Sequence, residues 1–315
     1  MRQRLQHTEA RAPHEVSLDH YEHRVGESVV QGHRPPGLHL GRDTLYTPED
    51  LYDTAAYEDS FDFRAYSWSR LHHSPNDTLA RALHDHAIDE ALTAWREGRH
   101  IVGVMGGHRI RRGDADYAEA ARLGRALGSS RVVATGGGPG AMEAANLGAW
   151  MAGRTDDELG EALTTLAAAP SYEPSVQAWV DAAFEVRRRY ASEEPARSLA
   201  IPTWHYGHEP PNVFSDAIAK YFRNSTREAI LLEVCDAGIV FLPGSAGTVQ
   251  EVFQDACENY YAVDSAVAPM LLLGTEYWTK TLPVWPLLRS VASGHPMAEH
   301  LFIVDSLDEV SEIVR

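Results

Sequence analysis

Lysine and cysteine are both scarce in this chain of 315 residues. Lys220 and Lys280 are the only lysines among its 28 basic residues, and the others are arginine. The two cysteines, Cys235 and Cys257, are too few for a zinc site made of four cysteines or for a framework of several disulfides. Each lies in a helical pattern, so we expect both to be small, reduced core residues.

Long apolar runs and a net positive charge are also missing. No apolar run reaches 18 residues, and the first residues lack the apolar stretch of a secretory signal. The formal net charge is 28 − 45 = −17, which disfavours non-specific binding to nucleic acid or to an anionic membrane. We therefore expect a cytoplasmic protein whose partners include neither nucleic acid nor membrane. Its 44% apolar and 23% charged residues are typical of a folded protein.

Residues 1–75 show little helical or alternating periodicity and hold half of the sixteen histidines. We interpret them as an irregular N-terminal arm that wraps the main domain or a neighbouring subunit. The pairs His20 with His23 and His72 with His73 raise the possibility of a metal site. Because no cysteine or carboxylate stands at a supporting ligand spacing, we expect no metal.

A regular alternation of helices and strands begins at Asn76 and runs to residue 315. Asn76 or Asp77 is expected to cap the first helix, which Gly98 ends. Short, continuously apolar strands that alternate with helices indicate a parallel sheet covered on both faces. We predict a doubly wound, Rossmann-like α/β fold for 76–315, with an acidic helical insert at about 154–197. The expected strands are 101–105, 131–135, 198–203, 238–242, 268–273 and 301–304, and the expected helices are 114–127, 140–152, 215–234, 247–261 and 280–293.

Three of the predicted strands run directly into glycine-rich loops, namely 106–108 (GGH), 136–140 (GGGPG) and 243–247 (PGSAG). Glycine lets a ligand approach the backbone closely, and the free N–H groups at the start of the next helix attract an anion. Ligands of doubly wound folds bind beyond the carboxyl ends of the strands. Three such loops in one sheet therefore predict binding of phosphate or of a nucleotide.

A nicotinamide-cofactor site is the first alternative. Gly136, Gly138 and Ala141 satisfy the pattern G-x-G-x-x-A after a predicted strand. That pattern requires a second strand that ends in an acidic residue about 20 residues later. Asp156 and Asp157 fall instead in the polar start of the insert. We therefore expect neither a nicotinamide nor any other cofactor.

Glu251 adds a carboxylate to the third loop. It lies four residues beyond Gly247, about one helical turn inside the helix and on the side that faces the loop. Spacing alone leaves two interpretations open. The carboxylate either faces a bound ligand or compensates the helix dipole, an effect worth roughly 0.3–1 kcal/mol.

Two of these loops together resemble the paired motifs of the Lonely Guy (LOG) family, GGGxGxM and PGGxGTxxE. The matching segments are 136–143 (GGGPGAME) and 243–251 (PGSAGTVQE). The chain is more similar still to the bacterial nucleotide 5′-monophosphate nucleosidases, which show a similar GGH, a GPGAMEA run, here 138–144, and an EPPN segment, here 209–212. The resemblance covers about residues 101–262, roughly half of the chain.

The resemblance implies an enzyme that hydrolyses the N-glycosidic bond of nucleoside 5′-monophosphates to free base and ribose 5-phosphate. It also implies a homodimer or a higher homo-oligomer. The family's catalytic glutamate matches Glu251, and its catalytic arginine matches Arg227, nine residues before Asp236 as in the family. The residues carried over to substrate and phosphate binding are Gly106, Gly107, Gly137, Gly138, Met142, Glu143, Asn212, Gly244, Ser245, Ala246, Gly247 and Thr248.

One residue departs from the family pattern, because Ser245 stands where the family has the second glycine of PGG. Serine keeps the backbone N–H and adds a hydroxyl, but its Cβ brings bulk close to the phosphate. The departure bears on substrate preference and, to a lesser degree, on activity.

Physical chemistry supports such an activity independently of the resemblance. Breaking a glycosidic bond builds positive charge on the ribose, and a nearby carboxylate stabilises that charge most in the transition state. Glu251 is expected in this role, in binding ribose hydroxyls or in orienting water, with Arg227 fixing it through a bidentate pair and neutralising phosphate. Glu143 and the loop of His205 and His208 are the candidates for protonating the leaving base.

Three other classes fit the sequence less well. A pyridoxal-phosphate decarboxylase, the family's historical label, needs a Schiff-base lysine, and neither Lys220 nor Lys280 follows a cofactor motif. A DNA-processing Rossmann protein needs a basic face. The main alternative is a non-catalytic nucleotide-binding module, which Ser245 favours and which Arg227 and Glu251 oppose.

Two sets of aromatic residues have no assigned chemistry. The stripe within 176–190 is expected to be packing surface of the insert. The pairs Tyr221-Phe222 and Tyr260-Tyr261 belong either to the core or to a two-fold contact.

Overall fold

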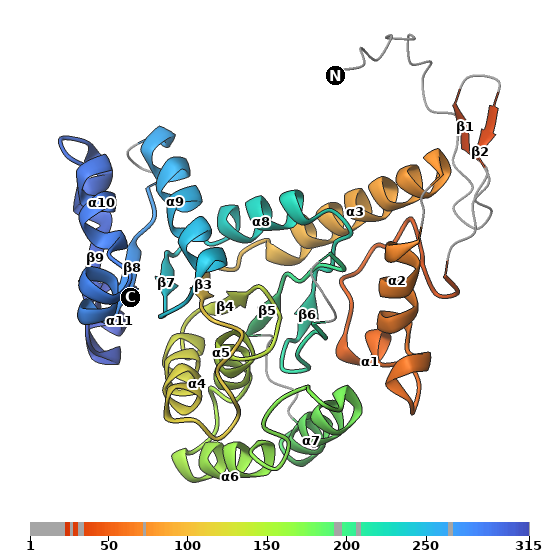
Figure 1. Ribbon diagram of the computed structural model, residues 1–315, viewed down its shortest axis with the longest axis horizontal. Coiled ribbons are helices and arrows are strands. Elements are labelled where there is room, and N and C mark those ends of the chain that lie inside the picture. Colours follow the sequence, from red (N-terminus) through yellow and green to blue (C-terminus); the bar gives the residue numbers. More distant parts are fainter. Residues whose placement is uncertain are drawn as a thin grey trace.

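The computed structural model describes residues 23–25, 28–30, 35–71, 74–191, 197–205, 209–263 and 267–314. One sheet of seven strands, all parallel, organises this part of the chain (Figure 1). This arrangement confirms the predicted doubly wound α/β fold. A separate antiparallel pair joins β1 (His23–Val25) to β2 (Ser28–Val30). The strands of the large sheet lie in the order β6 (Ala217–Ile218), β5 (Ser198–Ala200), β4 (Val132–Thr135), β3 (Ile101–Met105), β7 (Ile239–Phe241), β8 (Met270–Leu273) and β9 (Leu301–Val304).

The strand order places a topological switch point between β3 and β7. From β3 the chain builds the sheet outward through β4, β5 and β6, and it then returns to the other side of β3 as β7. In such sheets the crevice at the carboxyl ends of the two switch-point strands binds the ligand. A ligand site is therefore expected at the carboxyl ends of β3 and β7.

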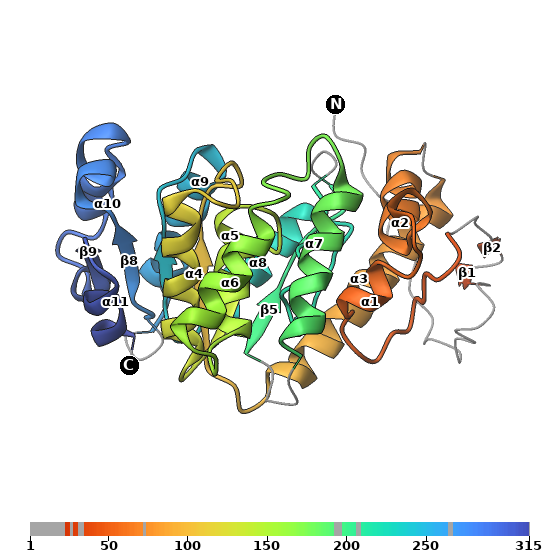
Figure 2. The ribbon, with the colours of Figure 1, turned by 90° about the horizontal axis from the view of Figure 1, so that it is seen from below.

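Helices cover both faces of the sheet (Figures 1 and 2). The alternating residues of β3 enter two different cores, with Ile101 and Met105 on one face and Val102 and Val104 on the other. The first face packs against α3 (Pro75–Arg96), α8 (Asn224–Glu233), α9 (Ala246–Tyr261) and α10 (Val284–Val291). The second packs against α4 (Ala115–Gly128), α5 (Ala141–Trp150), α6 (Asp156–Leu166), α7 (Val176–Arg189) and α11 (Leu307–Ile313).

Residues 35–71 are not the irregular arm that the sequence analysis expected. They form α1 (Pro48–Leu51), a 3-10 turn (Tyr57–Asp59) and α2 (Phe61–Arg70), and they contribute Leu51, Phe61 and Trp68 to the first core. Short helices rich in aromatic and polar residues carry too little periodicity to be predicted. His20, His72 and His73 lie outside the described residues, among which no group of three metal ligands occurs.

A buried ion pair fastens α2 to the sheet. Lys220 Nζ lies 2.5 Å from Asp62 Oδ1, with both side chains at most 2% exposed. Asp62 also accepts hydrogen bonds from Trp204 Nε1 at 2.8 Å and from the Tyr57 hydroxyl at 3.0 Å. Lys220 is thus a structural residue, which further weakens the hypothesis that a lysine of this chain forms a Schiff base with pyridoxal phosphate.

Several predicted boundaries are wrong. Ser74, not Asn76 or Asp77, caps α3, and Asp77 completes the capping box. The predicted helix 215–234 divides into β6 and α8, because residues 211–222 are buried almost all round and carry no amphipathic period. The predicted helix 280–293 divides into a π-helical turn (Tyr277–Thr281) and α10, separated by Pro283.

The remaining side chains divide between core and surface. Trp179, Val180 and Ala183 of α7 are buried, which confirms the insert's stripe as packing surface. Cys235 is buried as expected, whereas Cys257 is exposed and corrects the prediction of a second core thiol. In the described residues, no helix is both long and apolar enough to cross a membrane.

Candidate functional site

The loops that follow β3 and β7 meet at the switch point. A Cβ atom added to Gly107 would lie 3.6 Å from the carbonyl oxygen of Pro243 and 3.9 Å from Cα of Gly244. The first and third loops therefore lie side by side, separated by about the space that a Cβ atom on Gly107 would fill. Gly106 and Gly107 are partly exposed, and we refer to the region where these loops meet as the crevice.

The loop after β4 joins the same crevice. A Cβ on Gly140 would lie 2.7 Å from the carbonyl oxygen of Gly107, and φ at Gly140 is +73°. Such a close approach and a left-handed backbone both require glycine. The amide of Ala141 also donates to the Gly107 carbonyl at 3.1 Å. All three glycine-rich loops predicted from the sequence thus converge.

A buried polar network holds the β4 loop in place. The Asn212 amide donates to the Gly137 carbonyl at 2.8 Å, and its side-chain Nδ2 donates to Asn146 Oδ1 at 2.9 Å. Asn146 Oδ1 also accepts from Thr135 Oγ1 at 2.6 Å. Asn212 is fully buried, so it supports the loop from behind and does not line an open surface. Asn146 and Thr135 carry no motif signal, and the sequence analysis missed them.

Helix α9 presents its N-terminus to the crevice. Ser245, Ala246 and Gly247 are exposed, and the N-cap Ser245 makes no side-chain capping bond. A Cβ on Gly244 would lie 2.1 Å from Thr248 Oγ1, so glycine is required there. Ser245 itself has φ −116°, which any residue adopts, and the residue is exposed. The substitution therefore leaves the backbone N–H groups at this helix start available to an anion.

Arg227 and Glu251 lie beside these loops. Arg227 Nη1 lies 3.7 Å from the position that a Cβ on Gly136 would take, and Met142 packs over the same glycine. Burial raises the pKa of the Glu251 carboxyl to about 7, the Arg227 charge lowers it, and Glu228 raises it. The expected bidentate pair is not formed, since the ion pairs of the described residues do not include Arg227 with Glu251. Both groups remain free to contact a ligand. Asp236 takes no part, because it accepts from the Ile101 amide at 2.7 Å at the opposite end of β3.

Glu143 forms a buried ion pair with Arg112. Its Oε2 accepts from Arg112 Nε at 3.0 Å and its Oε1 accepts from Arg112 Nη2 at 2.5 Å, with both side chains 1% exposed. Arg112 Nη1 also donates to the Trp179 carbonyl at 2.9 Å. A carboxylate held on both oxygens and excluded from solvent is not available to substrate or to a leaving base. Sequence reasoning missed Arg112 because it lies 31 residues away in the chain.

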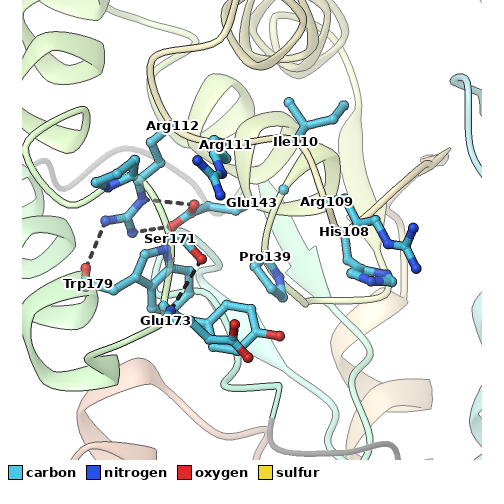
Figure 3. Close-up of a pocket in the computed structure, with 13 residues that line it drawn as sticks. His108, Arg109, Ile110, Arg111, Arg112, Pro139, Glu143, Ser171, Glu173 and Trp179 are labelled. Atoms are coloured by element: carbon cyan, nitrogen blue, oxygen red, sulfur yellow. Dashed lines mark hydrogen bonds and ion pairs between the residues drawn. The ribbon is translucent and has the colours of Figure 1, made fainter.

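A recess of about 300 Å³ opens between the loop 108–112, the start of α5 and the loop that joins α6 to α7. We call it the His108 recess. Figure 3 shows His108 and Arg109 at one end of it and the Arg112–Glu143 pair at the other. His108 Nδ1 lies 3.9 Å from Glu209 Oε1. Of the two histidines that were expected near the leaving base, His205 is exposed and His208 lies outside the described residues.

Similarity to known proteins is found among solved structures. No protein-family model and no curated protein sequence matches the chain. Among solved structures, the molybdenum cofactor binding protein of the phototrophic bacterium Rippkaea orientalis is similar over 69% of this chain and 95% of its own, at 18% identity and a TM-score of 0.44. The molybdenum cofactor carrier protein of Chlamydomonas reinhardtii is similar over 69% of this chain and 96% of its own, at 17% identity and a TM-score of 0.41.

Proposed function

We propose that this protein hydrolyses the N-glycosidic bond of nucleoside 5′-monophosphates, in the manner of the LOG family and of the nucleotide 5′-monophosphate nucleosidases. The main support for the proposal is the Glu251 carboxyl, which lies beside the glycine-rich loops at the switch point. Its pKa of about 7 allows it to be ionised or protonated near neutral pH. A general base works best when its pKa lies near the operating pH. Perturbed carboxyl groups in clefts are typical of functional sites.

The crevice offers a site for the 5′-phosphate without help from the net charge. The chain carries −17, so its long-range field repels an anionic nucleotide. The exposed start of α9 at Ala246 and Gly247, the hydroxyl of Thr248 and the Arg227 guanidinium supply the local attraction. Binding of the remote phosphate would hold the ribose in position for reaction.

Glu251 would act on the ribose and on water. Its ionised form stabilises the positive charge that develops at C1′ as the bond to the base breaks. The same carboxylate accepts the proton of the attacking water, whose oxygen forms the new bond to C1′. Arg227 would contact the phosphate or the ribose directly, because its guanidinium is not committed to Glu251. No cofactor or metal is needed for this chemistry.

We further propose a cytoplasmic homodimer. Tyr260 and Tyr261 on α9 are 37% and 81% exposed, and they are the aromatic pair on which a two-fold contact would form. Tyr221 and Phe222 are buried in the core and cannot contribute. Light scattering of the intact protein tests this part, and a monomer at all concentrations would contradict it.

The experiment is incubation of the protein with a panel of nucleoside 5′-monophosphates, with free base followed by chromatography. We expect base release by the wild type and its loss in Glu251→Gln, while binding of AMP is retained. Glu258→Gln is the matched control, because Glu258 is an exposed glutamate about two turns further along the same helix. If the wild type binds AMP and releases no base from any nucleotide, the non-catalytic binding module is correct and the hydrolase is not.

A further inference from the structure

More arginines than carboxylates line the His108 recess. Its charged lining residues are Arg109, Arg111, Arg112, Glu143 and Glu173. Glu143 neutralises Arg112, whereas Arg109 and Arg111 are exposed and have no ion-pair partner among the described residues. Figure 3 shows the Arg109 side chain beside His108 and the Arg111 side chain nearer the buried pair. A group that becomes negatively charged during a reaction would be stabilised here.

An imidazole and a carboxylate stand at the mouth of this recess. His108 Nδ1 and Glu209 Oε1 are 3.9 Å apart, and their side chains are 42% and 32% exposed. A Cβ on Gly138 would lie 3.6 Å from Glu209 Oε2, so the carboxylate adjoins the β4 glycine loop. Tyr172 lines the same recess. Burial raises the pKa of its hydroxyl, and the negative charges of Glu209 and Glu173 raise it further. A carboxylate beside an imidazole orients the ring.

The recess begins where the crevice ends. Gly107 lies next to Gly244 where the first and third loops meet, and the next residue of the same loop is His108. The Gly140 backbone packs against His108 from the other side, with 2.7 Å between its virtual Cβ and the His108 carbonyl oxygen. A ligand anchored by its phosphate at α9 therefore has the His108 recess as the next open space along the carboxyl edge of the sheet.

We propose that the His108 recess receives the nucleobase and that His108, oriented by Glu209, donates the proton that the leaving base needs. This inference rests on the proposed hydrolase activity. The bond between C1′ and the base nitrogen breaks, and its electron pair goes to the base. The imidazolium transfers its proton to a ring nitrogen of the base, while water adds to C1′ and gives a proton to Glu251. That proton returns to His108 through solvent, so the cycle adds one water to the nucleotide and leaves the enzyme unchanged.

Other groups that face His108 are less suited to this role. Glu143 is sealed in its ion pair with Arg112. Glu209 and Glu173 are acceptors while ionised, and the raised pKa of Tyr172 makes it a poor acid. Arg109 holds its protons too tightly to transfer one. An imidazole exchanges a proton readily near neutral pH, which is the condition for general acid catalysis.

The test compares two leaving groups in the wild type and in His108→Gln. AMP needs a proton on its departing base, whereas 7-methylguanosine 5′-monophosphate carries a base that is already positively charged and departs neutral. We expect His108→Gln to lower kcat for AMP by about 100-fold, the usual loss when a general acid is removed. The kcat for the methylated nucleotide should stay within a few-fold of wild type.

The opposite end of the same strand provides a matched control. His100 precedes β3 and pairs with Asp236, with Nδ1 and Oδ2 2.9 Å apart, on the edge of the sheet remote from the crevice. His100→Gln removes a surface histidine–carboxylate pair of the same kind. It should leave kcat for both substrates unchanged.

The orienting carboxylate gives a second comparison. Glu209→Gln removes the side chain that orients the His108 ring, so it should lower kcat for AMP and leave kcat for the methylated nucleotide close to wild type. Equal losses of kcat for both substrates in His108→Gln, or no loss of kcat for AMP in Glu209→Gln, would overturn the inference. If the wild type releases no base at all, the hydrolase proposal fails first. If Glu251→Gln is inactive while His108→Gln is normal on AMP, only the present inference fails.

Discussion

The Arg227 guanidinium lowers the pKa of the Glu251 carboxyl without forming an ion pair with it in the described structure. Burial acts in the other direction and prevails, so that the carboxyl titrates at about 7. Neither group is neutralised by the other. Each therefore retains its capacity to interact with a bound ligand, and Arg227 adjusts the protonation of Glu251 from a distance.

This coupling predicts opposite effects of two substitutions on the pH profile. Arg227→Gln removes a charge that lowers the pKa of Glu251, so the acid limb of kcat should move above its wild-type position near pH 7. Glu228→Gln removes a charge that raises the same pKa, so the limb should move to lower pH. The measurement is kcat for base release between about pH 5.5 and 9. Shifts in the same direction would show that the limb does not report Glu251.

Glu251→Gln is expected to stabilise the fold while it abolishes turnover. The folded pKa of about 7 lies above the ordinary 4.5, so the folded state binds more protons between these values and stability falls as pH rises through this window. The ionised carboxylate therefore destabilises the native state most at pH 8. One pKa unit is worth about 1.4 kcal/mol, and screening at this partly exposed group reduces the gain from glutamine to about 2 kcal/mol.

Urea unfolding at two pH values measures this gain. The difference in the free energy of unfolding between Glu251→Gln and wild type should be largest at pH 8. It should shrink by more than half at pH 5, because Glu251 of the folded wild type is then protonated and uncharged, as glutamine is. Such an inverse relation between stability and function is common at active sites. An equal difference at both pH values would contradict the raised pKa.

The glycine-rich loops of the site could be predicted from the sequence, whereas the buried polar residues that hold them could not. Glycine positions such as Gly140 and Gly244 could be recognised because the close approach of neighbouring atoms leaves no room for a Cβ, which leaves a visible pattern. Glu251 was assigned from its spacing to Gly247, whereas Arg227 was assigned only by the family resemblance, nine residues before Asp236. The doubly wound sheet followed from the alternation of short apolar strands and helices.

The partners of buried polar groups could not be predicted in the same way. Glu143 carries the motif, but its partner Arg112 is set only by the packing of α5 against the loop before α4. Asp62 and Lys220 are 158 residues apart and form a pair that no local pattern announces. Such pairs arise from tertiary contacts, so the sequence analysis assigned Glu143 to substrate binding.

The Arg112–Glu143 pair predicts a large loss of stability when it is broken on one side. Arg112→Met leaves the Glu143 carboxylate uncompensated at 1% exposure, which should destabilise the protein by about 3–5 kcal/mol. Adding Glu143→Leu removes the stranded charge and should recover much of that loss. Urea unfolding of the two single variants and the double variant measures the coupling. If Glu143 contacted substrate instead, Glu143→Gln would lower activity with no effect on stability.

The close packing of α4 against α5 predicts a second position at which substitution strongly destabilises the protein, and a glycine elsewhere in the chain provides the control. A Cβ on Gly148 would lie 1.9 Å from the Ala121 carbonyl oxygen and 2.6 Å from the Arg125 amide nitrogen, both backbone atoms of the facing helix. Backbone cannot yield without moving a whole helix, so Gly148→Ala should destabilise the protein by about 3 kcal/mol. Gly160 lies in α6 with nothing within 4 Å of its virtual Cβ. Gly160→Ala should therefore stabilise by about 0.5–1 kcal/mol, as expected for glycine within a helix.

Gly148→Ala should also weaken ligand binding at the crevice. Helix α5 begins at Ala141, directly after the β4 glycine loop, so a shift of α5 away from α4 displaces Gly140 from its contact with Gly107. We expect Gly148→Ala to weaken AMP binding at temperatures where the protein is still folded, and Gly160→Ala to leave it unchanged. Calorimetric titration of both variants with AMP measures this effect. Wild-type affinity in a destabilised Gly148→Ala protein would show that the glycine loop keeps its geometry independently of the helix that follows it.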